Sequence, residues 1–162
     1  MKAHYLSYAE TGRFTPLVVD YLAGDPVLEE FRSYAPSRAG LHAAAKDRSF
    51  PDAHRAVLCS ALDRQLAGVE LDPAVRANLD RLKDPRSLTV TTGHQLCLFT
   101  GPLYVPFKLL NTVRLAQALT VELGRPVVPI FWMASEDHDR AEIDHAVVNG
   151  ERIHWPGNAG GP

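Results

Sequence analysis

Two clusters of residues in this chain of 162 residues have types and spacings that suit chemistry. The first is the segment 91–108, TTGHQLCLFTGPLYVPFK, which follows a β-branched run and leads into a long amphipathic stretch. The second is the segment 135–139, SEDHD, which follows the next apolar run. Ligands of open parallel α/β sheets bind at the carboxyl ends of strands, and loops after parallel strands open on the same edge. The two clusters therefore predict a two-part site.

Gly93, His94 and Gln95 are the centre of the first cluster. A strand-to-helix junction offers free backbone N–H groups and partial positive charge, which suit a phosphate or carboxylate. Gly93 permits a tight turn with a close backbone approach. His94 can donate a hydrogen bond to a phosphate, or act as an acid or base near neutral pH. The alternative is that His94 and Gln95 only cap the turn. Neither the dinucleotide-binding nor the P-loop glycine fingerprint is present.

Four more residues of this segment are candidates, and each has a plain structural alternative. Gly101 and Tyr104 are expected to line the pocket, although Tyr104 fits ordinary packing equally well. Lys108 lies in the first turns of the expected helix and can reach a phosphate, but an exposed lysine is more often solvated. Cys97 has a potential base three residues away, but its apolar neighbours favour a buried thiol.

The predicted functional residues of the second cluster are Ser135, Glu136, Asp137 and His138. Crowded carboxylates beside an imidazole can hold a substrate ammonium, shift each other's pKa or bind a metal. Asp139 instead fits the start of a short helix, because Glu142 follows three residues later as in a capping box. The ligand count that a metal site requires is not evident, so no metal is predicted.

Composition is typical of a soluble globular protein, with 46% hydrophobic and 22% charged residues. A net charge of -2 gives no electrostatic reason to expect nucleic acid or an anionic membrane as a partner. The N-terminal residues lack the apolar core of a signal peptide, and the apolar stretch 126–134 is too short to span a bilayer. Two cysteines, Cys59 and Cys97, fit reduced thiols in a cytoplasmic protein.

The first half of the chain is predicted to be helical. Apolar residues recur at helical spacing from Val57 to Leu66, and Pro51 suits the first position of that helix. Asp72 is the expected N-cap of the next helix. Earlier helices are expected over 17–23, 27–34 and 41–48.

From residue 87 the pattern changes to strands alternating with a helix. The expected elements are a strand over 87–92, a loop or irregular helix start over 93–101, a helix over 103–123 and a buried strand over 126–133. Gly124 is the expected C-terminal stop of the helix. Strand, helix and strand make a right-handed βαβ unit, and the residues around Asn149-Gly150 predict a type I′ hairpin.

The predicted fold class is therefore α/β, the start of a Rossmann-like parallel sheet with a helical region before it and a β-hairpin near the C-terminus. The expected organisation is a helical N-terminal region over 1–86, the first part of the Rossmann-like core over 87–156 and a frayed tail over 157–162. A βαβ unit supplies only two strands, so the remainder of the core is expected to lie outside this chain.

Three blocks resemble the bacillithiol biosynthesis cysteine-adding enzymes, the BshC family of cysteine ligases: TTGHQLCLFTGPLYVPFK at 91–108, LGRPVVPIFWMASEDHD at 123–139 and AEIDHAVV at 141–148. The blocks are long, ordered and correctly spaced. The resemblance covers essentially the whole chain but only the opening part of the family. It implies that the family continues past this point, completing the core and adding a coiled-coil domain for homodimerisation.

The resemblance implies ligation of L-cysteine to glucosaminyl-malate, the last step of bacillithiol synthesis. Such an amide bond needs an activated carboxyl group, commonly an acyl-phosphate or adenylate, so ATP is the expected cofactor. On this hypothesis residues 93–95 stabilise phosphate charge, and Glu136, Asp137 and His138 hold and deprotonate the amine. The alternatives are an adenylate-forming or nucleotidyl-transferring Rossmann enzyme for another amino acid or amino sugar, and an inactive truncated fragment.

Overall fold

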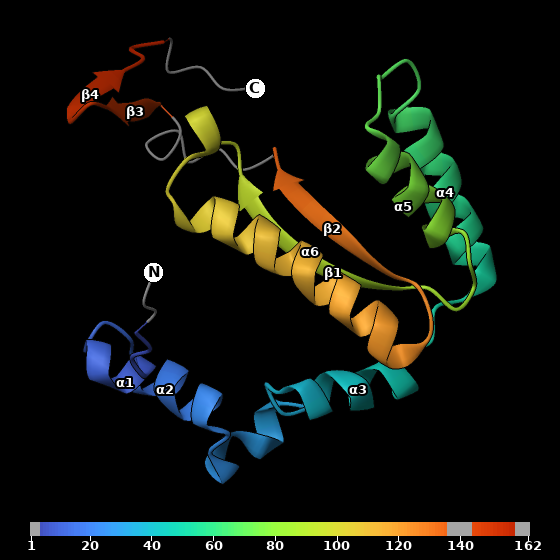
Figure 1. The fold of residues 1–162 in the computed structure, drawn as a ribbon, viewed down its shortest axis with the longest axis horizontal. Coiled ribbons are helices and arrows are strands. Elements are labelled where there is room, and N and C mark those ends of the chain that lie inside the picture. The colour runs from blue at the N-terminus through green and yellow to red at the C-terminus, as the bar shows by residue number, and fades with distance from the viewer. Residues whose placement is uncertain (1–3, 136–143, 158–162) are drawn as a thin grey trace. The chain divides into compact units, whose positions relative to one another are not determined.

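The computed structural model describes residues 4–135 and 144–157. The chain forms two compact units, residues 1–49 and 50–162. Figure 1 shows the helices and strands of both. The boundary between the units does not coincide with the change of sequence pattern at residue 87. The helical segment that follows residue 50 belongs with the sheet, because Cys59 and Leu82 pack against Val128 of a strand.

The first unit consists of short helices: α1 (Tyr8–Thr11), α2 (Pro16–Ala23), a 3₁₀ helix η1 (Pro26–Phe31) and α3 (Arg38–Asp47). The helices predicted over 17–23 and 41–48 are confirmed, and α3 starts earlier because the Ser37 side chain caps it. The helix predicted over 27–34 is present but shorter, and it is a 3₁₀ helix. It ends at Phe31, since Arg32 is extended and donates a hydrogen bond to the Gly24 carbonyl.

The second unit contains the helices α4 (Asp52–Gln65), α5 (Pro73–Leu82) and α6 (Tyr104–Leu123), and a 3₁₀ turn η2 (Leu98–Thr100). Its strands are β1 (Leu88–Gln95), β2 (Val127–Ala134), β3 (His145–Val148) and β4 (Glu151–His154). The Asp72 cap of α5 is confirmed, since its carboxylate accepts a hydrogen bond from the Ala74 N–H at 2.8 Å. Pro51 is the residue before α4 and not its first residue.

Both predicted turns are also confirmed. Gly124 ends α6 in the left-handed conformation, with φ of 61°. Asn149 and Gly150 join β3 to β4 with φ of 52° and 85°, the backbone that a type I′ hairpin turn requires.

The strands β1 and β2 form a parallel pair whose register runs from Leu88↔Val127 to Gln95↔Ala134. Figure 1 shows α6 lying along this pair. Alternate residues of the strands face different helices: Val127 packs with Ala116 and Leu119 of α6, whereas Val128 packs on the α4–α5 side. The pair therefore has helices on both faces, which is the arrangement of a Rossmann-like sheet.

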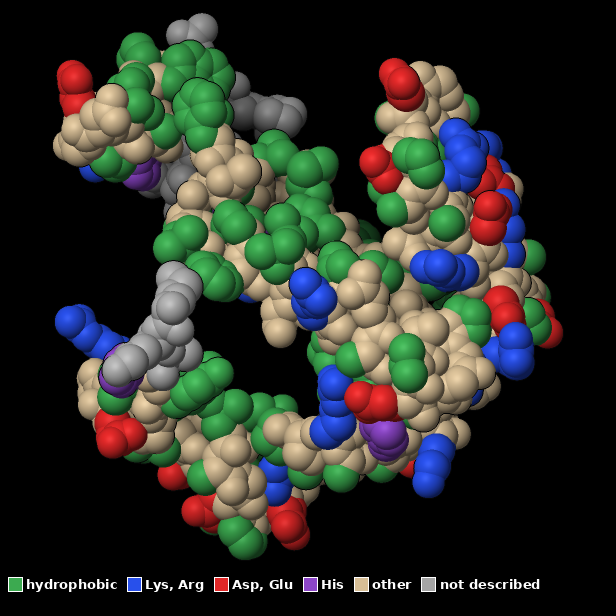
Figure 2. All heavy atoms as spheres, in the orientation of Figure 1, with side chains coloured by type: hydrophobic (Ala, Val, Ile, Leu, Met, Phe, Trp, Pro, Cys, Tyr) green, Lys and Arg blue, Asp and Glu red, His purple; other side chains and the backbone are tan. Residues whose placement is uncertain are grey.

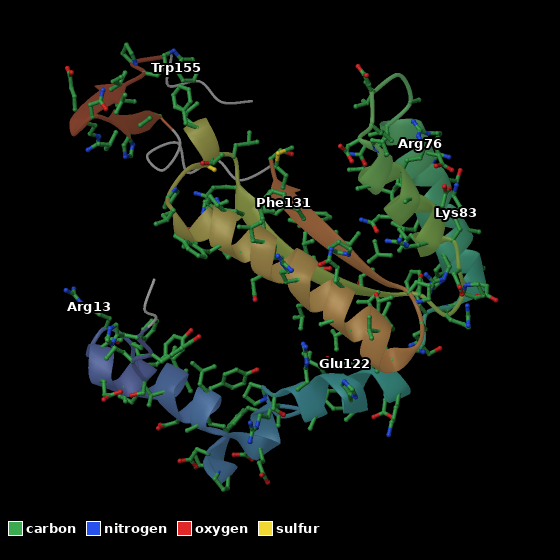
Figure 3. The ribbon with its side chains drawn as sticks, in the orientation of Figure 1. Arg13, Arg76, Lys83, Glu122, Phe131 and Trp155 are labelled. Carbon is green, nitrogen blue, oxygen red and sulfur yellow. The ribbon has the colours of Figure 1, made fainter. Side chains whose placement is uncertain are left out.

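The carboxyl half of β2 and the first half of α6 keep large apolar side chains exposed. Trp132 and Met133 are 61% and 55% exposed, and Phe131 lies beside them on β2 (Figure 3). On α6, Phe107 and Leu110 are similarly exposed, and hydrophobic side chains gather over this part of the helix in Figure 2.

Arg55 fastens α4 to the start of the sheet. The residue is 6% exposed, and its guanidinium donates hydrogen bonds to the Leu82 carbonyl at 3.0 Å, the Ser87 Oγ at 2.7 Å and the Pro85 and Ser87 carbonyls at 3.3 Å. It also stacks 5.3 Å from the centre of the Phe50 ring. One buried cation thus holds the turn from which β1 begins.

Replacing Arg55 by Met is expected to lower the free energy of unfolding by about 2–4 kcal/mol, because several buried acceptors lose their donor. Urea denaturation followed by circular dichroism measures the change. Arg64→Met is the matched control, since Arg64 is exposed on the same helix and its guanidinium donates to the Ser60 Oγ one turn away; it should cost less than about 0.5 kcal/mol. Equal losses in the two variants would contradict the role given to Arg55.

Candidate functional site

The candidate site lies where β1 and β2 end. The parallel register pairs Gln95 with Ala134, so Ser135 follows β2 at the same edge of the sheet at which His94 and Gln95 lie. This confirms that the two segments follow paired parallel strands, and Ser135 is the residue of the second cluster that the structure describes.

The position of residues 93–95 within the fold differs from the prediction. They are the last three residues of β1, not a turn at a helix N-terminus, and α6 begins only at Tyr104. The reason is the pairing with β2: a Cβ on Gly93 would lie 2.9 Å from the Trp132 carbonyl oxygen, so glycine allows the strands to stay close. The N–H groups of a helix start are therefore not what these residues contribute.

His94 is held by hydrogen bonds at both ring nitrogens. Its Nδ1 lies 2.9 Å from the Gln95 carbonyl, which can only accept, so Nδ1 carries the proton of the neutral ring. Nε2 then accepts from the Tyr104 hydroxyl at 2.5 Å. The two rings also meet edge to face, with centres 5.4 Å apart. His94 is thus oriented with its proton-accepting nitrogen toward Tyr104.

Lys108 joins this pair from the next turn of α6. Tyr104 and Lys108 are four residues apart and therefore share a helix face. The Lys108 ammonium donates a hydrogen bond to the Gly93 carbonyl at 2.5 Å and lies 5.6 Å from the centre of the Tyr104 ring. The expectation that Lys108 is an ordinary solvated side chain is wrong, because its side chain is partly buried and tied to β1.

The loop from β1 to α6 has an unusual backbone. Phe99 and Thr100 have φ of 49° and 70°, which non-glycine residues rarely adopt, and Gly101 follows with φ of 63°. A Cβ on Gly101 would lie 2.7 Å from the Cys97 sulfur, so only glycine fits there. Cys97 is a free cysteine and is partly exposed, so the expectation of a buried thiol is wrong. Strained loops of this kind are concentrated at functional sites.

Glu136, Asp137 and His138 lie outside the described residues, as does the capping pair Asp139 and Glu142. Their roles stay predictions. Within residues 4–135 and 144–157, no group of three or more His, Cys, Asp or Glu side chains is arranged to hold a metal ion.

Asp144, His145 and His154 form a cluster of titratable side chains that was not among the residues predicted from the sequence. The Asp144 carboxylate lies 3.0 Å from the His145 Nδ1 and 2.9 Å from the His154 Nε2. These hydrogen bonds hold the pKa of the Asp144 carboxyl below its usual value of 3.8, and the bond from His145 has the larger effect. The predicted hairpin contained the signal, since a two-residue turn at 149–150 pairs residue 145 with residue 154.

An apolar groove of about 750 Å³ lies in the first unit, lined by residues that include Tyr21, Leu22, Phe31 and Arg32. None of its lining residues belongs to the predicted site. Its mostly apolar lining suits packing against another apolar surface better than it suits binding of the charged groups expected at the candidate site.

The fold and the strand edge define a Rossmann-like α/β domain with a candidate ligand site at the carboxyl ends of its strands. The family profile described as "Bacillithiol biosynthesis BshC, N-terminal Rossmann-like domain" matches residues 1–161. This chain therefore belongs to the BshC family, as its sequence motifs predict, and forms its N-terminal Rossmann-like domain.

Individual relatives agree with the family match. Proteins named "Putative cysteine ligase BshC" are 42% identical over 147 residues in Cytophaga hutchinsonii, 38% over 158 residues in Christiangramia forsetii and 40% over 147 residues in Salinibacter ruber. These matches cover 90%, 96% and 90% of this chain but 28%, 29% and 27% of the relatives. The chain thus spans less than a third of their length. None of the described helices is long and apolar enough to cross a membrane.

Replacing Gly93 by Ala is expected to cost about 1–3 kcal/mol of stability, because the new methyl group meets the Trp132 carbonyl and pushes the strands apart. Urea denaturation measures the loss. Thr91→Ala is the control on an exposed position of the same strand and should cost less than about 1 kcal/mol. A Gly93→Ala protein as stable as the control would show that the close approach is not needed.

Stability should also depend on Asp144 in acid. Because its pKa is lower in the folded chain than in the unfolded chain, the ionised carboxylate stabilises the hairpin at neutral pH. That contribution is lost as the pH falls through the lowered pKa, below the usual value of 3.8. Asp144→Asn should therefore reduce stability at neutral pH and have progressively less effect in strong acid, measured by amide hydrogen exchange in β3 and β4. A difference that does not change with pH would refute this linkage.

Proposed function

We propose that this chain is the N-terminal part of a ligase that joins L-cysteine to glucosaminyl-malate through an amide bond, in the last step of bacillithiol biosynthesis. The observation that carries the proposal is the family match over residues 1–161. The relatives' printed name, which describes them as cysteine ligases, gives the reaction class. The proposed setting is the cytoplasm, and the assembly expected of the full-length enzyme is a homodimer.

The strand edge has groups that suit an activated carboxyl group. Forming an amide from a free carboxylate requires a leaving group on the acyl carbon, and we propose ATP as the co-substrate that supplies it as an acyl-phosphate or adenylate. Lys108 brings a positive charge to the end of β1 and uses its hydrogen bond to the Gly93 carbonyl to stay there. An ammonium held in this way can balance the negative charge of the phosphate as it leaves.

His94 and Tyr104 suit the removal of a proton from the attacking amine. Because the His94 Nδ1–H donates to the Gln95 carbonyl, Nε2 is the basic nitrogen of the ring. The Tyr104 hydroxyl donates a hydrogen bond to Nε2. In the proposed step the substrate ammonium gives a proton to this pair. Its nitrogen then attacks the acyl carbon, and the bond from that carbon to the phosphate oxygen breaks with its electrons on the oxygen.

The remaining predicted residues complete the proposal. Glu136, Asp137 and His138 are proposed to hold the substrate ammonium, whereas Gly101 of the loop before α6 and Ser135 at the end of β2 are proposed to border the pocket. Gly101 keeps the loop close to Cys97, and the Ser135 N–H donates to the Met133 carbonyl at 2.8 Å, which closes the turn after β2.

The test of the reaction is mass spectrometry of thiols in a bacillithiol-deficient cell. One culture expresses this chain, and another expresses the protein extended to the length of its relatives. Bacillithiol restored by the longer protein is the expected result. A failure of the longer protein to restore it, while it ligates another amino acid or amino sugar in a substrate scan, would overturn the proposed substrate pair.

In the extended protein, His94→Gln should lower kcat by about 10²–10⁴-fold, because the base is lost. Lys108→Met should lower kcat/KM by about 10²–10³-fold, because the leaving phosphate loses its counter-charge. Steady-state kinetics with purified substrates measure both changes. Lys46→Met, which removes an exposed lysine at the end of α3, is the control and should leave the rates unchanged. Wild-type rates in His94→Gln or Lys108→Met would exclude the corresponding role.

A further inference from the structure

The cluster of Asp144, His145 and His154 is placed to do more than close the hairpin. His145 and His154 are register partners at the open end of β3 and β4, and Asp144 directly precedes β3. One carboxylate oxygen bonds to each imidazole, at 3.0 Å to His145 and 2.9 Å to His154. A carboxylate that accepts a hydrogen bond from an imidazole fixes the orientation and tautomer of that ring, as the aspartate of a hydrolase triad does for its one histidine.

The cluster is rigid at its acidic centre and accessible at one ring. The Asp144 carbonyl accepts a hydrogen bond from the Trp155 N–H at 2.7 Å, which joins the two ends of the hairpin. The Asp144 side chain is 15% exposed, that of His145 28% and that of His154 52%. His154 is therefore the ring that a substrate can reach, and Asp144 is the group that holds it.

The hydrogen bonds also decide which nitrogen of each neutral ring is free to accept a proton. The ionised Asp144 carboxylate can only accept, so the His154 Nε2 carries the proton and its Nδ1 keeps the lone pair. The Asp144 carboxyl, whose pKa the hydrogen bonds from His145 and His154 hold below its usual value of 3.8, is ionised at neutral pH, as this orientation requires.

The hairpin packs beside the candidate site. The strand β3 contacts η2, and η2 is the turn that joins the His94 end of β1 to the Tyr104 start of α6. The hairpin that carries the cluster therefore lies next to the loop that connects His94 with Tyr104, although it comes from a different part of the chain.

We propose that His154 is a second proton acceptor for amide formation, with Asp144 as its positioning residue. This inference rests on the proposed function. A substrate ammonium loses two protons on its way to an amide N–H, one before its nitrogen attacks and one after the new carbon–nitrogen bond has formed. The His94–Tyr104 pair takes the first proton. The His154 Nδ1 takes the second from the nitrogen bonded to the acyl carbon, as the phosphate leaves with the electrons of its bond, and His154 then gives that proton to water.

The test uses the full-length protein that carries this chain and compares three variants. His154→Gln keeps an N–H donor for Asp144 but removes the proton acceptor, so the hairpin should persist while kcat falls by about 10²-fold or more, with little change in KM. His154→Ala should lose activity similarly and regain part of it when free imidazole is added. His54→Ala, which removes an exposed histidine of α4, is the control and should show neither effect.

Three results would overturn the proposal: a wild-type kcat in His154→Gln, a similar loss in His54→Ala, or no rescue of His154→Ala by imidazole. Asp144→Asn adds an independent readout. Nitrogen NMR of the imidazoles should show the proton of His154 on Nε2 in the wild type and a mixture of tautomers in this variant. If the wild-type protein forms no amide from L-cysteine and glucosaminyl-malate, the proposed function fails instead. If it does and His154→Gln matches it, only the present inference fails.

Discussion

The parallel pairing of β1 with β2 is the constraint on which the rest of this domain depends. It runs to the last residues of both strands, from Leu88↔Val127 to Gln95↔Ala134, and brings His94 and Ser135 to one edge. At Gly93 the close approach of the strands depends on the missing Cβ, which would lie 2.9 Å from the Trp132 carbonyl oxygen. The same pairing sets which side chains face α6 and which face α4 and α5. The core and the candidate site therefore both depend on the pairing of β1 with β2.

Two cations secure β1 at its opposite ends. Arg55 of α4 donates to the Ser87 carbonyl just before the strand begins, and Lys108 of α6 donates to the Gly93 carbonyl near its end. In both cases a charged side chain donates a hydrogen bond to a neutral backbone carbonyl, and such a bond is stronger than a hydrogen bond between two neutral groups. The consequence differs at the two ends. Arg55 is buried, whereas Lys108 is partly exposed, and its ammonium has N–H groups beyond the one that bonds to Gly93, as the proposed phosphate contact requires.

Local signals predicted most of the helices and the hairpin, because caps and turn residues act within a few positions of the chain. Asp72 and Gly124 mark helix ends, and Asn149-Gly150 marks the turn, where the structure has them. The place of His94 was harder to predict. The β-branched run ends at Thr92, and only the partner strand shows that β1 continues to Gln95. The bridge from Asp144 to His154 was within reach, since hairpin register alone pairs residues 145 and 154.

The sequence by itself determined the family, the α/β class and the order of elements, because these depend on motif spacing, hydrophobic period and turn chemistry. Its residue types also marked His94 and Lys108 as candidates. Only the tertiary structure decided that His94 accepts from Tyr104, that Lys108 is tied to the Gly93 carbonyl and that Asp144 bridges two histidines. The physical reason is that a hydrogen bond depends on distances of a few tenths of an ångström between atoms of different elements, and packing alone sets those distances.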